Sequence, residues 1–280
     1  METTDNVKTE LLLSSSAAGG LDIRKAFEMG SQLDVSGIEI MPYKSSLFTL
    51  EGNVGNISEL ADRYKLPVRG VHFPFWWETK STFRAIWNEF PNIKEMAMAL
   101  AWAYLVGPGS KDSLASQLAT NFRDAYLLFH GDTFCQMPEE DMKYFTGRKV
   151  LFETERPKRN SRNDLQWIVE TVIPIAHKSG VDGKIMFDPR HIQIAQMQGK
   201  ADNILLEQIW MKYQGQMGGM HFSFIRDGNY FPSSPSPEVW SHLKEAVKAY
   251  PPKILVLEVG PGKQRELEKC RDLVYRDLGI

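Results

Sequence analysis

Residues with metal-binding side chains recur at the ends of apolar runs along this 280-residue chain. The clearest example is the stretch KIMFDPRH at residues 184–191. Its apolar run stops at Asp188, a proline follows, and His191 comes three residues after the aspartate. Carboxylate oxygens and imidazole nitrogens are common ligands of divalent ions. The stretch therefore predicts a buried strand that opens into a loop carrying a metal or catalytic site.

Five further apolar runs end at a residue of the same kind: His72, His130, Glu153, His221 and Glu258. Carboxylates gathered on one rim would repel one another unless a cation neutralised them, and a divalent ion does this. We therefore predict a metal site, with His72, His130 and His191 either as ligands or as substrate contacts, and with packing in the core as a further alternative for His72 and His130. The remaining histidines, His177 and His242, fall in predicted helices, and we expect them to have structural or solvent-exposed roles.

The elements that must position these residues alternate regularly between strands and helices. Eight strands are predicted at residues 11–13, 37–41, 68–73, 125–130, 149–153, 184–188, 217–222 and 253–258. Helices are predicted at residues 21–33, 57–64, 82–90, 93–105, 139–144, 164–178, 203–213, from 236 onward, and 264–278. Continuous apolar strands are typical of parallel sheets covered on both faces. Eight such units predict a (β/α)8 TIM barrel, in which the strand ends meet at one catalytic face.

We expect one barrel domain over residues 11–280, preceded by a polar, flexible N-terminus over residues 1–10. The alternative is an open doubly wound sheet, which favours a glycine-rich phosphate loop after the first strand. Residues 14–20 (SSSAAGG) fit such a loop poorly, so we expect no nucleotide cofactor. Glu39 is the third residue of its strand, and the sequence leaves open whether it points to the rim or into the barrel.

The composition is that of a soluble globular protein. Apolar residues make up 42% of the chain, its formal charge is −2 and its pI is about 6.3. This charge argues against a nucleic-acid partner, although it leaves room for a local basic patch. The two cysteines, Cys135 and Cys270, form no metal-binding spacing and favour a reducing compartment. No apolar run is long enough to span a bilayer, so we expect a cytoplasmic protein without a membrane partner.

The order of the strand-end residues resembles the metal site of the xylose-isomerase-like barrels. That superfamily contains sugar isomerases and epimerases, and also the endonuclease-IV type of apurinic/apyrimidinic endonuclease. The resemblance consists of Glu at the fifth strand, Asp-x-x-His at the sixth, His at the seventh and Glu at the eighth. It is carried here by Glu153, Asp188, His191, His221 and Glu258, and it covers nearly the whole chain in element order.

The epimerase branch implies that Glu153, Asp188, His221 and Glu258 bind one divalent ion (Mn, Mg, Co or Zn). Glu153 and Glu258 would then exchange a proton at the carbon beside a substrate carbonyl. His191 and Arg226 would contact the substrate. This branch predicts a metal-dependent isomerase or epimerase of carbohydrate metabolism, with a small sugar or sugar phosphate as its partner.

Two residues in predicted loops are further candidates for substrate binding. Trp76 belongs to an aromatic cluster after the third strand that could wall a pocket. Lys263 ends a Gly-Pro-Gly-Lys turn after the eighth strand, where barrels often bind phosphate. A tight turn into the last helix explains that stretch equally well.

The nuclease branch implies a second metal position formed by His72, His130 and Glu153, with water activated to attack a phosphodiester. It explains the two histidines better than the epimerase branch does. However, that family also carries an Asp-x-His in its seventh loop for a third zinc, and residues 222–230 here contain an Asp but no His. A third alternative is a non-catalytic barrel that only binds a ligand. The oligomeric state stays open, and a homo-oligomer is compatible with the sequence.

Overall fold

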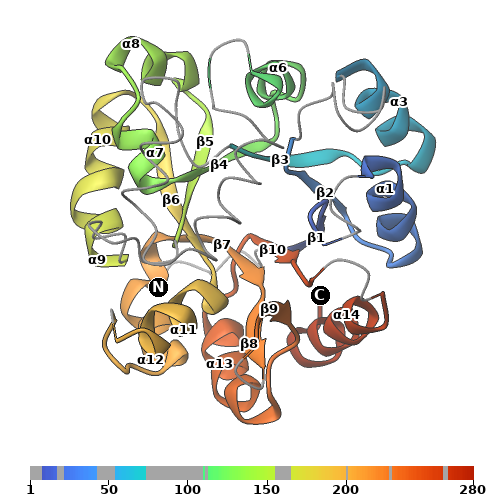
Figure 1. The fold of residues 1–280 in the computed structure, drawn as a ribbon, viewed down its shortest axis with the longest axis vertical. Coiled ribbons are helices and arrows are strands. Elements are labelled where there is room, and N and C mark those ends of the chain that lie inside the picture. The colour runs from blue at the N-terminus through green and yellow to red at the C-terminus, as the bar shows by residue number, and fades with distance from the viewer. Residues whose placement is uncertain are drawn as a thin grey trace, which may run out of the picture.

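Eight parallel strands close into a barrel, as predicted (Figure 1). The computed structural model describes residues 8–17, 22–42, 54–73, 110, 113–154, 165–199, 201–226, 229–260 and 264–280. The barrel strands, in their order around the barrel, are β1 (Glu10–Ser14), β2 (Gly37–Ile40), β3 (Val68–His72), β4 (Tyr126–His130), β5 (Lys149–Glu153), β6 (Asp182–Phe187), β7 (Met217–Phe222) and β10 (Ile254–Leu257). Because β10 pairs with β1, the alternative of an open doubly wound sheet is wrong.

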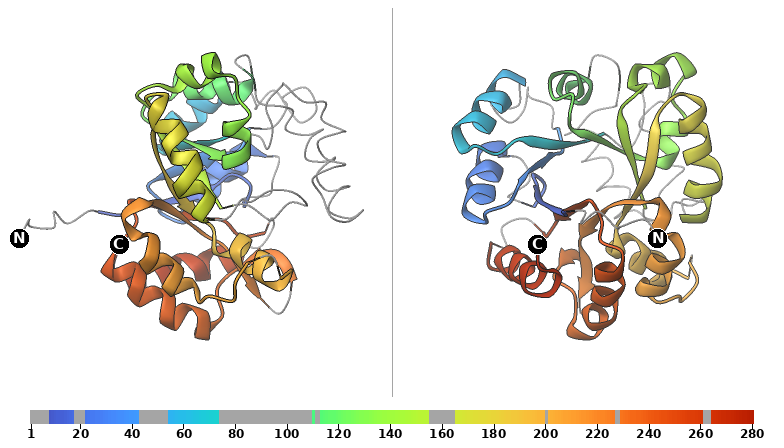
Figure 2. Two further views of the ribbon diagram at one scale, coloured as in Figure 1. Left: turned by 90° about the vertical axis from the view of Figure 1, so that its left-hand side faces the viewer. Right: turned by 180° about the vertical axis from the view of Figure 1, so that it is seen from behind.

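Helices surround the barrel on its outside, as the end-on and side views show (Figures 1 and 2). Those described are α1 (Ile23–Gln32), α3 (Val54–Tyr64), α6 (Leu114–Asn121), α7 (Gly131–Cys135), α8 (Glu139–Met142), α9 (Leu165–Trp167), α10 (Ile173–Lys178), α11 (Pro189–Met197), α12 (Leu206–Tyr213), α13 (Pro237–Ala249) and α14 (Gln264–Leu278). A π-helical turn over Ile168–Val172 joins α9 to α10. None of the described helices combines the length and the apolar character needed to cross a membrane.

Several elements differ from the sequence-based expectation. The sixth strand opens into helix α11 and not into a loop, because Asp188 caps this helix and Pro189 occupies its first turn. The fourth strand likewise continues directly into α7 at Gly131. Helix α6 and the hairpin of β8 (Phe224–Arg226) and β9 (Asn229–Ser233) were not predicted. The expected helices at 82–90 and 93–105 lie outside the described residues.

Alternation along each strand decides which side chains enter the barrel. In β4, Leu127 and Phe129 pack in the outer core beneath the helices, whereas Leu128 faces inward. The inward-facing apolar side chains form one interior cluster that fills the barrel: Leu12, Tyr126, Leu128, Leu151, Met186 and Val256. Because side chains on one face recur every second residue, His130 follows Leu128 into the interior at the end of the strand.

The same alternation applies to the other strands that carry candidate residues. Glu153 follows Leu151 by two positions, Asp188 follows Met186, and Glu258 follows Val256. Each of these candidates therefore occupies the next inward-facing position after a residue of the interior cluster. The interior cluster closes the barrel below them, and the candidate residues form the layer above it, at the carboxyl ends of the strands.

Candidate metal centre

Four of the strand-end residues converge in one buried group. Glu153, Asp188, His221 and Glu258 each offer a ligand atom, and these atoms all lie within 4.8 Å of one another. His221 lies at the centre, with its Nδ1 atom 2.7 Å from Glu153 Oε1 and 3.2 Å from Glu258 Oε2. The Asp188 Oδ2 atom lies 3.9 Å from the same nitrogen. We call this group the tetrad.

Among the described residues, the hydrogen bonds around the tetrad leave one atom of each side chain without a hydrogen-bond partner, although ion-pair contacts such as those of His221 Nδ1 remain. Asp188 Oδ1 accepts from the backbone N–H of His191, and Glu258 Oε1 accepts from the Ser16 hydroxyl at 3.3 Å. The unsatisfied buried atoms are Glu153 Oε2, Asp188 Oδ2, His221 Nδ1 and Glu258 Oε2. Leaving such atoms buried without a partner is costly. A divalent ion would satisfy a set of this kind, and one imidazole with three carboxylates suits Mn, Mg, Co or Zn.

Charges within the tetrad shift the ionisation of its members strongly. Burial opposes the charged form of His221, but Glu39, Glu153 and Glu258 outweigh it and raise the pKa of His221 well above its usual value. Burial is the largest single effect and raises the pKa of each glutamate. His221, together with His72 at Glu153 and with Arg190 at Glu258, outweighs it and lowers the pKa of both. The net result is a pKa of about 2 for Glu258 and a pKa well below the usual value for Glu153. Without an ion, His221 is therefore the cation that balances these carboxylates.

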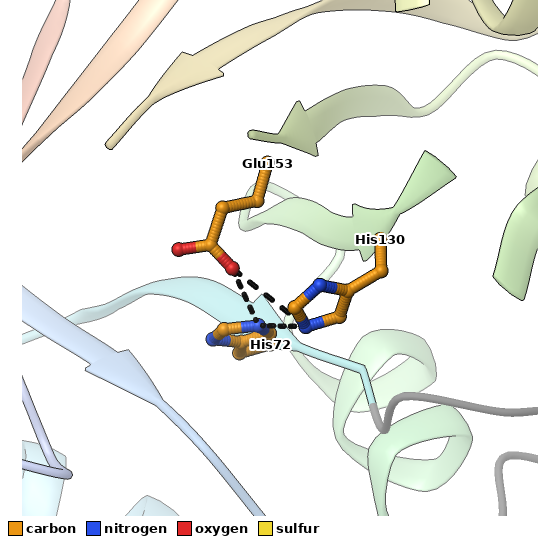
Figure 3. A group of neighbouring side chains, drawn as sticks. All are labelled: His72, His130 and Glu153. Carbon is orange, nitrogen blue, oxygen red and sulfur yellow. Dashed lines mark hydrogen bonds and ion pairs between the residues drawn. The ribbon is translucent and has the colours of Figure 1, made fainter. Parts of the chain in front are cut away.

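A second group adjoins the tetrad and shares one residue with it. Figure 3 shows His72, His130 and Glu153 converging from β3, β4 and β5. The Nε2 atoms of His72 and His130 are 3.2 Å apart. Glu153 Oε2 lies 3.4 Å from Nε2 of His72 and 3.6 Å from Nε2 of His130. Glu153 thus turns Oε1 toward the tetrad and Oε2 toward the histidine pair. We call His72, His130 and Glu153 the second group.

Glu39, whose direction the sequence left open, points into the barrel and is fully buried. Its Oε2 atom accepts a hydrogen bond from the Tyr126 hydroxyl at 2.6 Å and lies 3.3 Å from His221 Nε2. Tyr126 was not predicted as a site residue, because it lies among apolar residues of β4. Sequence reasoning also missed Ser16, Thr154 and Arg190.

Thr154 holds both Asp188 and His191 in place. Its hydroxyl accepts from the backbone N–H of Asp188 at 2.9 Å, and its carbonyl oxygen lies 2.7 Å from His191 Nδ1. A carbonyl can only accept, so Nδ1 of His191 carries the proton. The Nε2 atom of His191 is then the acceptor for the Arg190 guanidinium at 2.9 Å. His191 therefore has both ring nitrogens engaged by protein groups.

The other predicted residues lie in different surroundings. Arg226, on β8, is partly exposed and lies 3.9 Å from Glu266. His177 and His242 are exposed on α10 and α13. Trp76 and Lys263 lie outside the described residues. In place of the predicted arginine, the structure brings Arg190 to the ligand residues, 3.7 Å from Asp188 Oδ2.

No protein-family model matches the chain, and no curated protein is similar to it in sequence. Solved structures are similar in fold. A D-allulose 3-epimerase from Methylomonas sp. is 10% identical, with 97% of this chain and 98% of that chain covered at a TM-score of 0.60. An AP endonuclease, family 2, from Brucella melitensis is 12% identical, with 96% and 99% covered at 0.54.

A fusion protein described as a xylose isomerase-like TIM barrel joined to a 4-hydroxyphenylpyruvate dioxygenase is also similar. It is 12% identical, with 96% of this chain and 42% of that chain covered at a TM-score of 0.54. The predicted resemblance to the xylose-isomerase-like barrels is therefore confirmed at the level of the fold.

Proposed function

We propose that this barrel is a divalent-metal-dependent isomerase or epimerase that acts on a sugar or sugar phosphate. The observation that carries the proposal is the tetrad, in which four buried side chains bring ligand atoms within 4.8 Å of one another. Two of its members are glutamates close to the same imidazole nitrogen. The fold similarity to a D-allulose 3-epimerase agrees with this chemistry.

The two glutamates would exchange the proton at the carbon beside the substrate carbonyl. Both are ionised at neutral pH, because their pKa values lie far below 7. One glutamate would remove the proton as a base, and the carbon would regain a proton from a carboxylic acid formed by this uptake or by exchange with solvent. The Glu258 side chain is 12% exposed, against 2% for Glu153, which makes Glu258 the more accessible of the two. A divalent ion held by the tetrad would polarise the carbonyl and stabilise the negative charge that develops there.

Positioning of the substrate would fall to residues beside the tetrad. The imidazole of His191 is neutral and held by Thr154 and Arg190, so it presents a fixed, uncharged surface there. Arg190 places a guanidinium next to Asp188 and lowers the pKa of Glu258, after the larger effect of His221. Among the described residues, it would therefore be a cation close to an anionic substrate group. Arg226, Trp76 and Lys263 remain candidates for contacts farther out.

Solvent exchange measures the proposed reaction directly. Incubated with Mn²⁺ or Co²⁺ and ketoses or ketose phosphates in D₂O, the protein is expected to place deuterium on the carbon beside the carbonyl. Glu153→Gln and Glu258→Gln should each slow this exchange by roughly 10²–10⁴-fold, the usual contribution of a general base. Glu266→Gln, which alters a carboxylate beside Arg226, serves as the control. Full exchange in both glutamine variants would refute the assigned roles.

A second candidate function is favoured by the shared position of Glu153. Its two carboxylate oxygens face different ligand groups, an arrangement in which one carboxylate bridges two ions. Pairs of bridged ions are typical of enzymes that hydrolyse phosphate esters. The similarity to the AP endonuclease agrees with this alternative at the level of the fold. His191 cannot serve a third ion here without losing its bond to Arg190.

The number of bound ions separates the two candidates. Two ions per chain, together with cleavage of an abasic DNA duplex or of bis(p-nitrophenyl) phosphate, would support the hydrolase. The double variant His72→Ala/His130→Ala should then lose one ion and the cleavage, whereas the exposed pair His177→Ala/His242→Ala should lose neither. One ion per chain without hydrolysis would eliminate this candidate.

A further inference from the structure

A carboxylate lies directly beneath both ligand groups. Glu39 comes from β2, and neither ligand group includes it. Its Oε2 atom lies 3.3 Å from Nε2 of His221, on the side of that ring opposite the tetrad. Its Oε1 atom lies 3.9 Å from Nδ1 of His72, on the side of that ring opposite Glu153. The Glu39 carboxylate therefore faces one imidazole of each group, at the ring nitrogen that is not turned toward Glu153: Nε2 of His221 and Nδ1 of His72.

Hydrogen-bond chemistry decides what Glu39 does to His221. An ionised carboxylate can only accept, so Nε2 of His221 must carry a proton and donate it to Glu39. When the imidazole is neutral, its lone pair then lies on Nδ1, the atom turned toward Glu153 and Glu258. The contact thus selects the tautomer that is able to bind an ion and fixes the ring in the plane that aims it.

The strands beneath the site are built to hold Glu39 in this position. Register pairs Glu39 with Gly70 of β3, and Gly70 in turn with Tyr126 of β4, so the three residues lie side by side across adjacent strands. A Cβ atom on Gly70 would lie 2.4 Å from the Tyr126 ring. The missing side chain therefore lets the phenol of Tyr126 cross β3 and donate to Glu39 at 2.6 Å.

The phenol is also a permanent donor. Burial and the neighbouring Glu39 raise the pKa of Tyr126 well above its usual value, so the hydroxyl keeps its proton throughout the neutral range. Glu39 Oε1, by contrast, is buried and has no hydrogen bond within the described residues, where it faces His72 at 3.9 Å. Burying a carboxylate with one oxygen unsatisfied is costly, and this cost is expected where the group has a function.

We propose that Glu39 is a positioning residue shared by both ligand groups, which orients His221 toward the tetrad through Oε2 and His72 toward Glu153 through Oε1. The inference rests on the proposed metal-dependent function, because it assigns Glu39 a role toward ions held by those groups. It goes beyond that function by linking the two groups through one side chain of the layer below. Removing Glu39 should therefore weaken ion binding at both groups together.

Cobalt binding tests the proposal without reference to activity. Dissociation constants for Co²⁺ would be measured by competition with a chromophoric chelator, and the electronic absorption of the bound ion would be recorded. Loss of a carboxylate that orients a ligating histidine typically weakens ion binding by about 10–100-fold. Glu39→Ala is expected to weaken the binding of each Co²⁺ ion by a factor of this size and to alter the absorption spectrum. Glu39→Gln keeps a hydrogen-bond acceptor and should recover part of the lost affinity.

Two further variants separate positioning from packing. Tyr126→Phe keeps Glu39 but removes the hydroxyl that donates to it, so a smaller loss of Co²⁺ affinity is expected. This variant also keeps the test possible if Glu39→Ala does not fold. Leu151→Ala opens a cavity in the interior cluster without touching Glu39, and it should bind Co²⁺ as the wild type does.

Two results would overturn the role of Glu39. One is wild-type affinity in Glu39→Ala and Tyr126→Phe, and the other is an equal loss of affinity in Leu151→Ala. In both cases the wild type would still bind Co²⁺, and the proposed function would survive. A wild-type protein that bound neither Co²⁺ nor Mn²⁺ would instead refute the proposed function, and with it the role of Glu39.

Discussion

Binding of the first ion to the tetrad should release one proton, and that proton should come from His221. In the metal-free protein the carboxylates around it raise the pKa of His221 well above its usual value, so the ring is an imidazolium at neutral pH. An ion at Nδ1 requires the neutral ring, because the ligand is its lone pair. The pKa values of Glu153 and Glu258 are lowered, so these residues have no proton to release above about pH 5.

The magnitude follows from this stoichiometry. Where one proton leaves for each ion bound, the apparent affinity rises about tenfold per pH unit, or roughly 1.4 kcal/mol, as long as the pH is below the pKa of the displaced group. Because the pKa of His221 is raised from 6.5, this slope should extend across the range from about pH 5.5 to 7. A site made of ionised carboxylates alone would show almost no slope there.

Calorimetry in two buffers with different ionisation enthalpies counts the released protons. We expect one proton per ion at pH 6 for the wild type and for His242→Gln, which alters an exposed histidine on α13. A count of zero, or an affinity that does not change between pH 5.5 and 7, would refute the assignment of His221 as the internal cation. A count near two would mean that a carboxylate of the tetrad is protonated as well.

Two further predictions concern the metal-free fold. The ionised form of Glu258 stabilises the fold at pH values above 4.5, its usual pKa, and this contribution is lost as the pH falls through its folded pKa of about 2. The protonated form of His221 stabilises the fold fully at pH values below 6.5, its usual pKa, and this contribution is lost as the pH rises through its raised pKa. Melting temperatures of chelator-treated protein should therefore be highest between about pH 4.5 and 6.5, and a monotonic rise to pH 9 would contradict this. Gly70→Ala would press a Cβ against Tyr126 and should cost about 1–3 kcal/mol in urea denaturation, whereas Gly215→Ala, which meets open space, serves as the control.

The barrel and the convergence of the candidate residues were predictable for a simple physical reason. Eight apolar runs separated by helical segments have few ways to bury both faces of every strand, and a closed parallel barrel is one of them. That topology brings all carboxyl ends of the strands to one rim. Glu153 and Glu258 are far apart in sequence, yet their strand-end positions alone predicted that they would meet.

Glu39 could not be placed in the same way. Both faces of a barrel strand are buried, and the neighbours of Glu39, Ile38 and Ile40, are apolar. The sequence therefore does not show whether Glu39 or its neighbours point into the barrel. The decision depends on register, which pairs Glu39 with Gly70 and places it one layer below His72. Register between strands joined by long connections is a tertiary property, and no local pattern in the chain encodes it.

The helix after the sixth strand shows a different limit. The stretch Asp188-Pro189 carries the chemistry of a helix start, with a capping carboxylate and a proline in the first turn. The same residues also suit a strand that stops at a ligand, and the metal interpretation alone predicted a loop. Both are true, because Asp188 Oδ1 caps the helix while Oδ2 faces the tetrad.

The internal charge balance of the tetrad explains how such a site survives folding without an ion. Three carboxylates and a neutral imidazole would be a costly set to bury, since Arg190, 3.7 Å from Asp188, offsets only part of their negative charge. Protonated His221 changes this, because it faces Glu153 and Glu258 through one nitrogen and Glu39 through the other. The carboxylates that retain this proton are those that would hold an ion. Any metal that binds Nδ1 of His221 must therefore displace this proton, and the proton affinity of His221 sets how much the apparent metal affinity is reduced.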